Sequence, residues 1–207
     1  MVLSGKPELD REAIESVLSQ TGVDLELVLV ESRGRRNLAP SIDTRVRNLR
    51  ASRPPSRLRL LQRLAQESAA PFILCLDPEQ QLLPGALASV LADMQNDQSI
   101  EMMYALQFPA DESGHVSRPG YHLQWEQARG LQAMDVTRVQ SFLTLDFLPG
   151  NIRIYRRQAL LEKVFRRPKP YSTYGFIWSV HCLLNAKLKS DPVCIIKGSQ
   201  AVTASKQ

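Results

Sequence analysis

Helical and strand-like patterns alternate along the first half of the chain, and this alternation is the strongest constraint on its fold. Apolar residues at one-face helical spacing follow Pro7 and Pro84, and a third such stripe runs through residues 57–69. Between these helices lie three short, almost wholly apolar runs, at residues 25–30, 72–76 and 100–106. Apolar strands of this kind are typical of a sheet covered by helices on both faces. The order predicts an α/β fold with a mixed, mostly parallel central sheet.

The chain is long enough for one good-sized core. Of its 207 residues 43% are hydrophobic, so that burial at about 25 cal/mol per Å² can offset chain entropy without disulfide or metal staples. We expect one domain, 1–207, in which residues 107–150 form an irregular insertion and residues 198–207 a frayed tail. No window approaches a membrane span and no signal peptide is evident, so we expect a cytoplasmic protein, peripheral to a membrane at most.

The positive charge is concentrated in residues 33–63, which we call the Arg-rich segment. It holds ten Arg and one acid, Asp43, and so carries +9, whereas the remainder carries −4 of the net +5. Guanidinium groups can grip phosphate or carboxylate at two points, which makes this segment a candidate basic patch. The patch residues are Arg33, Arg35, Arg36, Arg45 and Arg47. A solvated loop without a ligand, leading into a helix start, accounts for the same composition.

Nucleic acid is a poor match for the Arg-rich segment. It contains no aromatic side chain that could stack on a base, and no recognition motif is present. An anionic membrane surface fits better, because each basic residue near such a surface contributes about 1 kcal/mol. The chain also lacks the glycine-rich motifs of dinucleotide and P-loop sites.

Three segments in the first half carry a family resemblance. Residues 12–21 read Glu-Ala-Ile-Glu-Ser-Val-Leu-Ser-Gln-Thr, residues 26–31 read Glu-Leu-Val-Leu-Val-Glu, and residues 72–87 read Phe-Ile-Leu-Cys-Leu-Asp-Pro-Glu-Gln-Gln-Leu-Leu-Pro-Gly-Ala-Leu. In sequence, order and spacing they resemble the family 2 glycosyltransferases. The likeness covers residues 7–106 well and residues 149–196 loosely. It implies a GT-A fold and transfer of a sugar from a nucleotide-diphosphate donor to an acceptor glycan or lipid.

The resemblance implies a donor site at two strand ends. Asp77 and Glu79 occupy the family's D-x-D position, which implies that both hold Mn or Mg and that Asp77 binds the nucleotide sugar. A divalent cation on carboxylate oxygens neutralises the departing diphosphate as a Lewis acid. Glu31 matches an acid that contacts the nucleobase or ribose in the family. Each acid also has a purely structural alternative, since Asp77 can cap a turn and Glu31 can pair with nearby arginines.

Three family features are missing from the sequence. At most a stub of the opening strand is present, and Leu61-Gln62 stands where the family usually carries Arg-Asn. An inverting transferase needs a general base, yet residues 174–179 contain no acid at the corresponding position. We therefore assign no catalytic residue. These departures suggest a degenerate member, and they leave open a second function: an inactive relative that binds a protein, a membrane surface or a polyanion through the Arg-rich segment.

Overall fold

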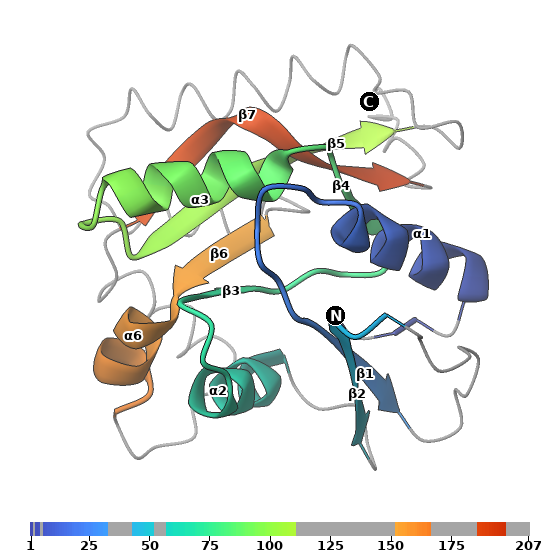
Figure 1. Ribbon diagram of the computed structural model, residues 1–207, viewed down its shortest axis with the longest axis horizontal. Helices are drawn as coiled ribbons and strands as arrows, with labels where there is room; N and C mark the ends of the chain where they lie inside the picture. Colours follow the sequence, from blue (N-terminus) through green and yellow to red (C-terminus); the bar gives the residue numbers. More distant parts are fainter. Residues whose placement is uncertain are drawn as a thin grey trace, which may run out of the picture.

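The computed structural model describes residues 1, 3, 4, 6–32, 43–51, 57–110, 152–166 and 186–197 (Figure 1). Their elements, in chain order, are α1 (Pro7–Leu18), β1 (Leu27–Ser32), β2 (Val46–Ala51), α2 (Arg57–Glu67), β3 (Phe72–Leu74), β4 (Gln80–Leu82), α3 (Ala86–Asn96), β5 (Met102–Ala110), β6 (Ile152–Arg156), α6 (Arg157–Ala159), the π-helical turn η1 (Leu160–Val164) and β7 (Ala186–Lys197). Among these residues no helix has both the length and the apolar character needed to cross a bilayer.

The strands form two sheets in which both strand directions occur. The larger sheet has the order β3-β6-β5-β7-β4, and the smaller pairs β1 with β2. The β1–β2 and β5–β7 pairs are parallel, and the β3–β6, β5–β6 and β4–β7 pairs are antiparallel. The expected mixed sheet is confirmed, but "mostly parallel" is wrong for the larger sheet, because β6 and β4 run back against their neighbours.

The first residues of the chain extend the smaller sheet. The backbone nitrogen of Val30 donates to the Met1 carbonyl at 2.9 Å, and the nitrogen of Leu3 donates to the Val30 carbonyl at 3.1 Å. This alternation is that of a parallel ladder. On its other edge β1 pairs with β2, beginning with a bond of 2.8 Å from Leu27 N to the Arg45 carbonyl. Residues 1 and 3 therefore pair with β1 on the edge opposite to β2.

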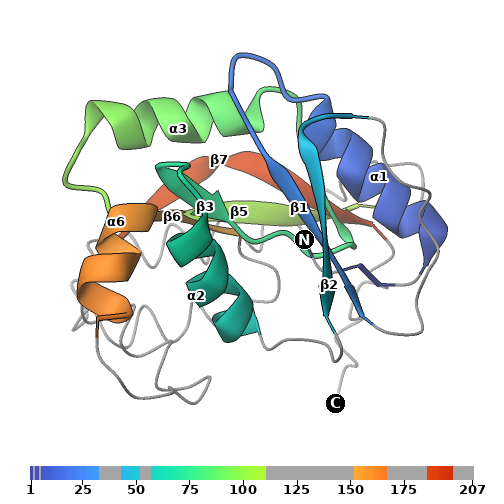
Figure 2. The same ribbon diagram turned by 60° about the horizontal axis from the view of Figure 1, so that its bottom comes forward.

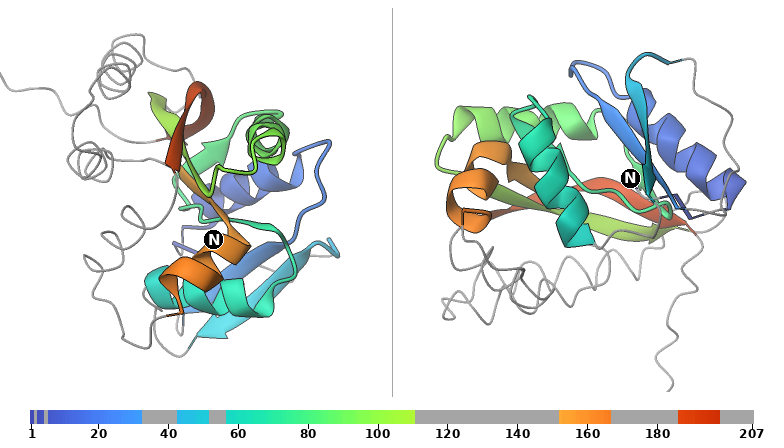
Figure 3. Two further views of the ribbon diagram at one scale, coloured as in Figure 1. Left: turned by 90° about the vertical axis from the view of Figure 1, so that its left-hand side faces the viewer. Right: turned by 90° about the horizontal axis from the view of Figure 1, so that it is seen from below.

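Both faces of β1 are buried, which explains its nearly continuous apolar sequence. Leu27 and Leu29 belong to the main core, together with residues of α1, α3, β5 and β6. Val28 and Val30 point the other way and pack with Leu60 and Leu64 of α2. Figure 2 shows α3 lying over the larger sheet, and Figure 3 shows α2 beside α6. Helices thus cover opposite faces of β1, as the sequence predicts.

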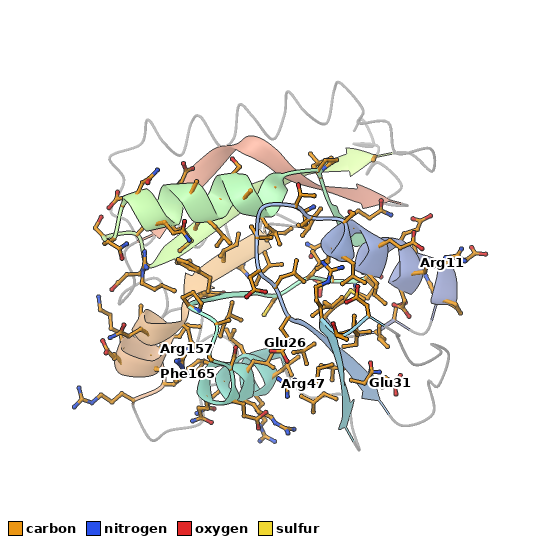
Figure 4. The ribbon with its side chains drawn as sticks, viewed as in Figure 1. Arg11, Glu26, Glu31, Arg47, Arg157 and Phe165 are labelled. Atoms are coloured by element: carbon orange, nitrogen blue, oxygen red, sulfur yellow. The ribbon has the colours of Figure 1, made fainter. Side chains whose placement is uncertain are left out.

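Two adjacent arginines at the end of β6 cap two different helices. Arg156 donates to the Met94 carbonyl of α3 at 2.6 Å and to the Ile100 carbonyl at 3.1 Å. Arg157, labelled in Figure 4, donates from Nη1 to the Ala65 carbonyl of α2 at 3.1 Å. The last carbonyls of a helix have no partner within it and carry its partial negative charge. The two side chains therefore tie the ends of α2 and α3 to the sheet.

Several expected boundaries differ from the structure. The Arg-rich segment is not one irregular connection, because it contains β2. Val46 packs against the main core, whereas Leu49 packs toward α2, so β2 lacks the alternation that marks a one-sided strand. Residues 107–110 belong to β5 rather than to an insertion, while residues 111–150 and the tail 198–207 lie outside the described residues.

Candidate functional site

The acidic pair lies on a tight turn between β3 and β4. β3 ends at Leu74, so Asp77 comes three residues after it. Residues 77–80, which we call the acidic turn, are closed by a 2.9 Å bond from Gln80 N to the Asp77 carbonyl. Asp at the first position and Pro78 at the second are typical of a β-turn. Asp77 is half-buried and Glu79 is exposed.

Gln80 closes the acidic turn a second time with its side chain. Its Oε1 accepts a hydrogen bond from the backbone nitrogen of Asp77 at 2.7 Å. Gln80 is only 4% exposed, which makes its side chain a fixed partner rather than a mobile surface group. Gln80 is not among the site residues predicted from the sequence. A signal for it exists, since a polar residue at the fourth position of an Asp-Pro turn lies within reach of the first.

One polar stripe of α1 holds the segment that follows the acidic turn. Glu12 and Ser16 are four residues apart and share one face of α1, and Gln20, just beyond the end of the helix, continues the same spacing. Glu12 accepts a bond from Gln81 Nε2 at 2.5 Å, and Ser16 Oγ accepts one from Leu82 N at 3.1 Å. These contacts lock α1 onto β4.

The side chain of Gln20 makes its hydrogen bonds at the start of α3. The residue is 5% exposed. Its Nε2 donates to the Leu83 carbonyl at 2.9 Å, and its Oε1 accepts from Leu87 N at 3.1 Å. The same Nε2 also donates to the Ser16 carbonyl at 3.0 Å, so this buried amide is hydrogen-bonded through both its nitrogen and its oxygen. The Ser-Val-Leu-x-Gln-Thr motif, on which the family resemblance largely depends, thus has a structural role here.

Glu31 lies near the carboxyl end of β1. It is half-buried, stands opposite Arg50 in the β1–β2 register, and belongs to the face of β1 that carries Leu27 and Leu29. In Figure 4 Glu31 lies at one end of β1 and Glu26 lies at the other. In Figures 1 and 2 the β3–β4 connection runs toward the same side of the molecule as this end of β1. Glu31 belongs to β1 of the smaller sheet, whereas the acidic turn leads into β4 of the larger one.

Arg45 and Arg47, the two residues of the predicted basic patch that the structure describes, each pair with a carboxylate. Arg45 makes a two-point pair with Asp43, with bonds of 3.1 Å from Nε and 2.7 Å from Nη2. The hydrogen bonds from the Arg45 side chain and backbone lower the pKa of Asp43 from 3.8 to about 2. Arg33, Arg35 and Arg36 lie outside the described residues.

Arg47 belongs to a chain of surface ion pairs. Its Nε donates to Glu26 at 2.6 Å and its Nη1 lies 4.0 Å from Glu67, which also pairs with Arg63 at 2.7 Å (Figure 4). Glu26 and Glu67 lie just outside the Arg-rich segment, so a charge count over that segment misses them. Folding brings these acids to the arginines.

The acidic turn offers oxygen ligands suited to a hard divalent cation. Asp77 and Glu79 are separated by one residue, and carboxylate oxygens are the donors that Mg and Mn prefer. Within the described ranges, no cluster of three or more His, Cys, Asp or Glu side chains could form a metal site. A cation held here would take its other ligands from water and from the phosphates of a bound nucleotide, as Mg²⁺ commonly does.

Comparison with known proteins supports the fold through structure rather than sequence. No family model and no curated protein matches the sequence. Residues 1–349 of TarS from S. aureus match with a TM-score of 0.55 and 13% identity, over 95% of this chain and 58% of that one. The Pyrobaculum calidifontis mannosyltransferase PcManGT, in complex with GDP-Man and Mn2+, matches with a TM-score of 0.60 and 12% identity, over 94% and 54%.

A third solved structure points the same way. GalNAc-T7 with UDP, GalNAc and Mn2+ matches with a TM-score of 0.51 and 11% identity, over 89% of this chain and 40% of that one. The chain thus spans about half the length of these neighbours, all of which are glycosyltransferases of the GT-A type. At such low identity the likeness establishes architecture alone. The chain has a GT-A-like fold.

Proposed function

We propose that the protein is a glycosyltransferase that binds a nucleotide-diphosphate sugar at the acidic turn and transfers the sugar to an acceptor glycan or lipid. Asp77 and Glu79 would hold a Mn or Mg ion, and Glu31 would accept hydrogen bonds from the nucleoside. The observation that carries the proposal is the position of Asp77 and Glu79 on a doubly closed turn of a GT-A-like fold.

The proposed transfer has a definite chemical balance. The bond between the sugar's anomeric carbon and the β-phosphate oxygen breaks, and its electron pair leaves on the nucleoside diphosphate. The acceptor oxygen forms the new bond and gives its proton to a base. A cation on Asp77 and Glu79 would supply Lewis-acid neutralisation of the leaving diphosphate. No residue is assigned as this base, since residues 174–179 contain no acid and lie outside the described residues.

The inactive alternative depends on arginines that are available to a polyanion. Arg45 and Arg47 already meet carboxylates, which compete with any external phosphate. A polyanion or membrane site would therefore rest more on the other arginines of the Arg-rich segment, such as Arg33, Arg35 and Arg36. Because the contacts of Arg45 and Arg47 are internal, we favour the transferase.

A thermal-shift experiment tests the proposal. The melting temperature is measured with UDP-sugars and GDP-sugars, each with and without Mn²⁺. A ligand present at 100 times its Kd adds about 2.7 kcal/mol of stability. In a domain of this size that corresponds to a rise of roughly 5–10 °C. We expect one nucleotide class to raise the melting temperature, and the rise to require the metal.

Two variants locate the site. Asp77→Asn removes a charged ligand and should abolish the metal-dependent rise. Asp24→Asn changes an exposed acid in the loop before β1 and should leave the rise intact. A wild-type protein that responds to no nucleotide, while binding anionic vesicles at low salt, would replace the transferase with the inactive alternative. A full metal-dependent rise in the melting temperature of Asp77→Asn would show that the nucleotide and metal bind at another site.

A further inference from the structure

We propose that Gln80 is a positioning residue that sets the direction of the Asp77 carboxylate toward a bound divalent cation. This inference rests on the proposed function of the acidic turn. Gln80 itself is only 4% exposed and follows Glu79 directly, so it is placed to act through the turn rather than as a ligand.

The geometry gives Gln80 two holds on Asp77. The backbone nitrogen of Gln80 donates to the Asp77 carbonyl at 2.9 Å, and its Oε1 accepts from the Asp77 nitrogen at 2.7 Å. Together they hold the peptide groups on both sides of the Asp77 Cα. With these held, the Cα–Cβ direction is set, and the carboxylate keeps only the rotation about its own side-chain bonds.

Gln80 is the first residue of β4, and the contacts of this strand hold it in place. The backbone nitrogen of Leu82 donates to Ser16 Oγ of α1 at 3.1 Å. β4 also pairs with β7, Gln80 standing opposite Ile196. A partner anchored on a helix and a strand can hold a metal ligand more closely than a loop residue can. Groups that orient metal ligands in this way commonly change metal affinity about 10- to 100-fold when they are replaced.

The test separates positioning from general stability by replacing two neighbouring glutamines. Gln80→Met keeps the side-chain volume but withdraws the acceptor from the Asp77 nitrogen. Gln81→Met is the matched control on the same strand, since it removes only the contact with Glu12. Gln80→Asn, one methylene shorter, also withdraws the acceptor and replaces the Met variant should that one not fold.

Two quantities are measured well below each variant's melting temperature. The first is amide hydrogen exchange at Asp77 without ligand, and the second is Mn²⁺ affinity in the presence of the nucleoside diphosphate that stabilises the wild type, followed by EPR of unbound Mn²⁺. We expect Gln80→Met to speed exchange at Asp77 and to weaken Mn²⁺ binding about tenfold or more. Gln81→Met should lower the melting temperature while keeping wild-type Mn²⁺ affinity.

Each contrary result has a distinct meaning. Wild-type Mn²⁺ affinity in Gln80→Met and Gln80→Asn would overturn the positioning role and leave the proposed function standing. An equal loss in Gln81→Met would overturn it as well, because the effect would then be one of general stability. A wild-type protein that binds no Mn²⁺ with any nucleoside diphosphate would refute the proposed function, and the role of Gln80 would fall with it.

Discussion

The side chain of Gln20, two residues after the last residue of α1, accepts a hydrogen bond at 3.1 Å from the backbone nitrogen of Leu87 in the first turn of α3. The first N–H groups of a helix have no partner inside it, and a side chain from the same chain segment usually supplies one. Gly85, the residue preceding α3, has no side chain that could supply this bond. Gln20 supplies the acceptor from 67 residues away, and so couples the two helices.

Replacing Gln20 should therefore destabilise the protein more than replacing a typical polar residue does. Gln20→Ala removes the acceptor of the Leu87 N–H and one of the two hydrogen bonds to the Leu83 carbonyl, which keeps its bond from Ala86 N. We expect the free energy of unfolding to fall by about 1–3 kcal/mol. Urea denaturation measures this change, and Gln98→Ala on the exposed end of the α3–β5 connection serves as control, with a change within about 0.5 kcal/mol. Equal stability of the two variants would contradict the role of Gln20.

Arg156 should contribute to stability through its hydrogen bonds to two carbonyl groups and its position over the ring of Phe72. Its guanidinium carbon lies 5.1 Å from the centroid of Phe72, in addition to its bonds to Met94 and Ile100. Hydrogen bonds from charged donors contribute about 1.5–3 kcal/mol, so we expect Arg156→Ala to cost about 2 kcal/mol in thermal or urea unfolding.

Two further arginine substitutions separate charge from shape at this position. Arg156→Lys should recover only part of the loss, because a lysine presents a point charge without the planar fork. Arg166→Ala changes an exposed arginine and should alter stability by no more than about 0.5 kcal/mol. Full recovery by lysine would show that charge alone, rather than the shape of the guanidinium group, stabilises the end of α3.

The Asp43–Arg45 pair gives a prediction about pH. The pKa of Asp43 is lowered from 3.8 to about 2 in the folded protein, mainly by the side-chain hydrogen bond from Arg45. A depressed folded-state pKa means that the contribution is complete above about pH 5, where the carboxyl is almost fully ionised in both states, and is lost as the pH falls toward 2. In Arg45→Ala we expect the pKa of Asp43 to rise toward 3.8, as followed by NMR titration of its carboxyl carbon. An unchanged pKa in that variant would assign the shift to another group.

The Glu26–Arg47 pair should contribute little despite its short distance. Both side chains are about two-fifths exposed, at 43% and 41%, so water and salt screen their attraction. A double-mutant cycle with Glu26→Gln and Arg47→Gln should give a coupling free energy below about 1 kcal/mol, falling further in 0.5 M NaCl. A coupling that is larger and insensitive to salt would show that the network with Glu67 acts as a buried unit.

The acidic turn shows how far the candidate site could be predicted from sequence. The sequence predicts Asp77 and Glu79 because their order after an apolar run resembles a known family. It does not predict Gln80, because the contact of its Oε1 with the Asp77 nitrogen and its burial appear only in the folded chain. The charge of the Arg-rich segment does not reveal the partners of Arg47, because Glu26 and Glu67 lie outside that segment.

Local patterns in the sequence determined α1, α3, β1 and β3 and their order, because helix stripes and apolar strand runs are read within a few residues. Tertiary structure alone decided that β2 is a strand, that β4 and β6 run antiparallel to their neighbours, and that the Ser-Val-Leu-x-Gln-Thr motif holds β4 and α3. The physical reason is distance along the chain. Sheet pairing and hydrogen bonds such as that from Leu87 to Gln20 join residues far apart in sequence, and only the folded chain brings their donors and acceptors together.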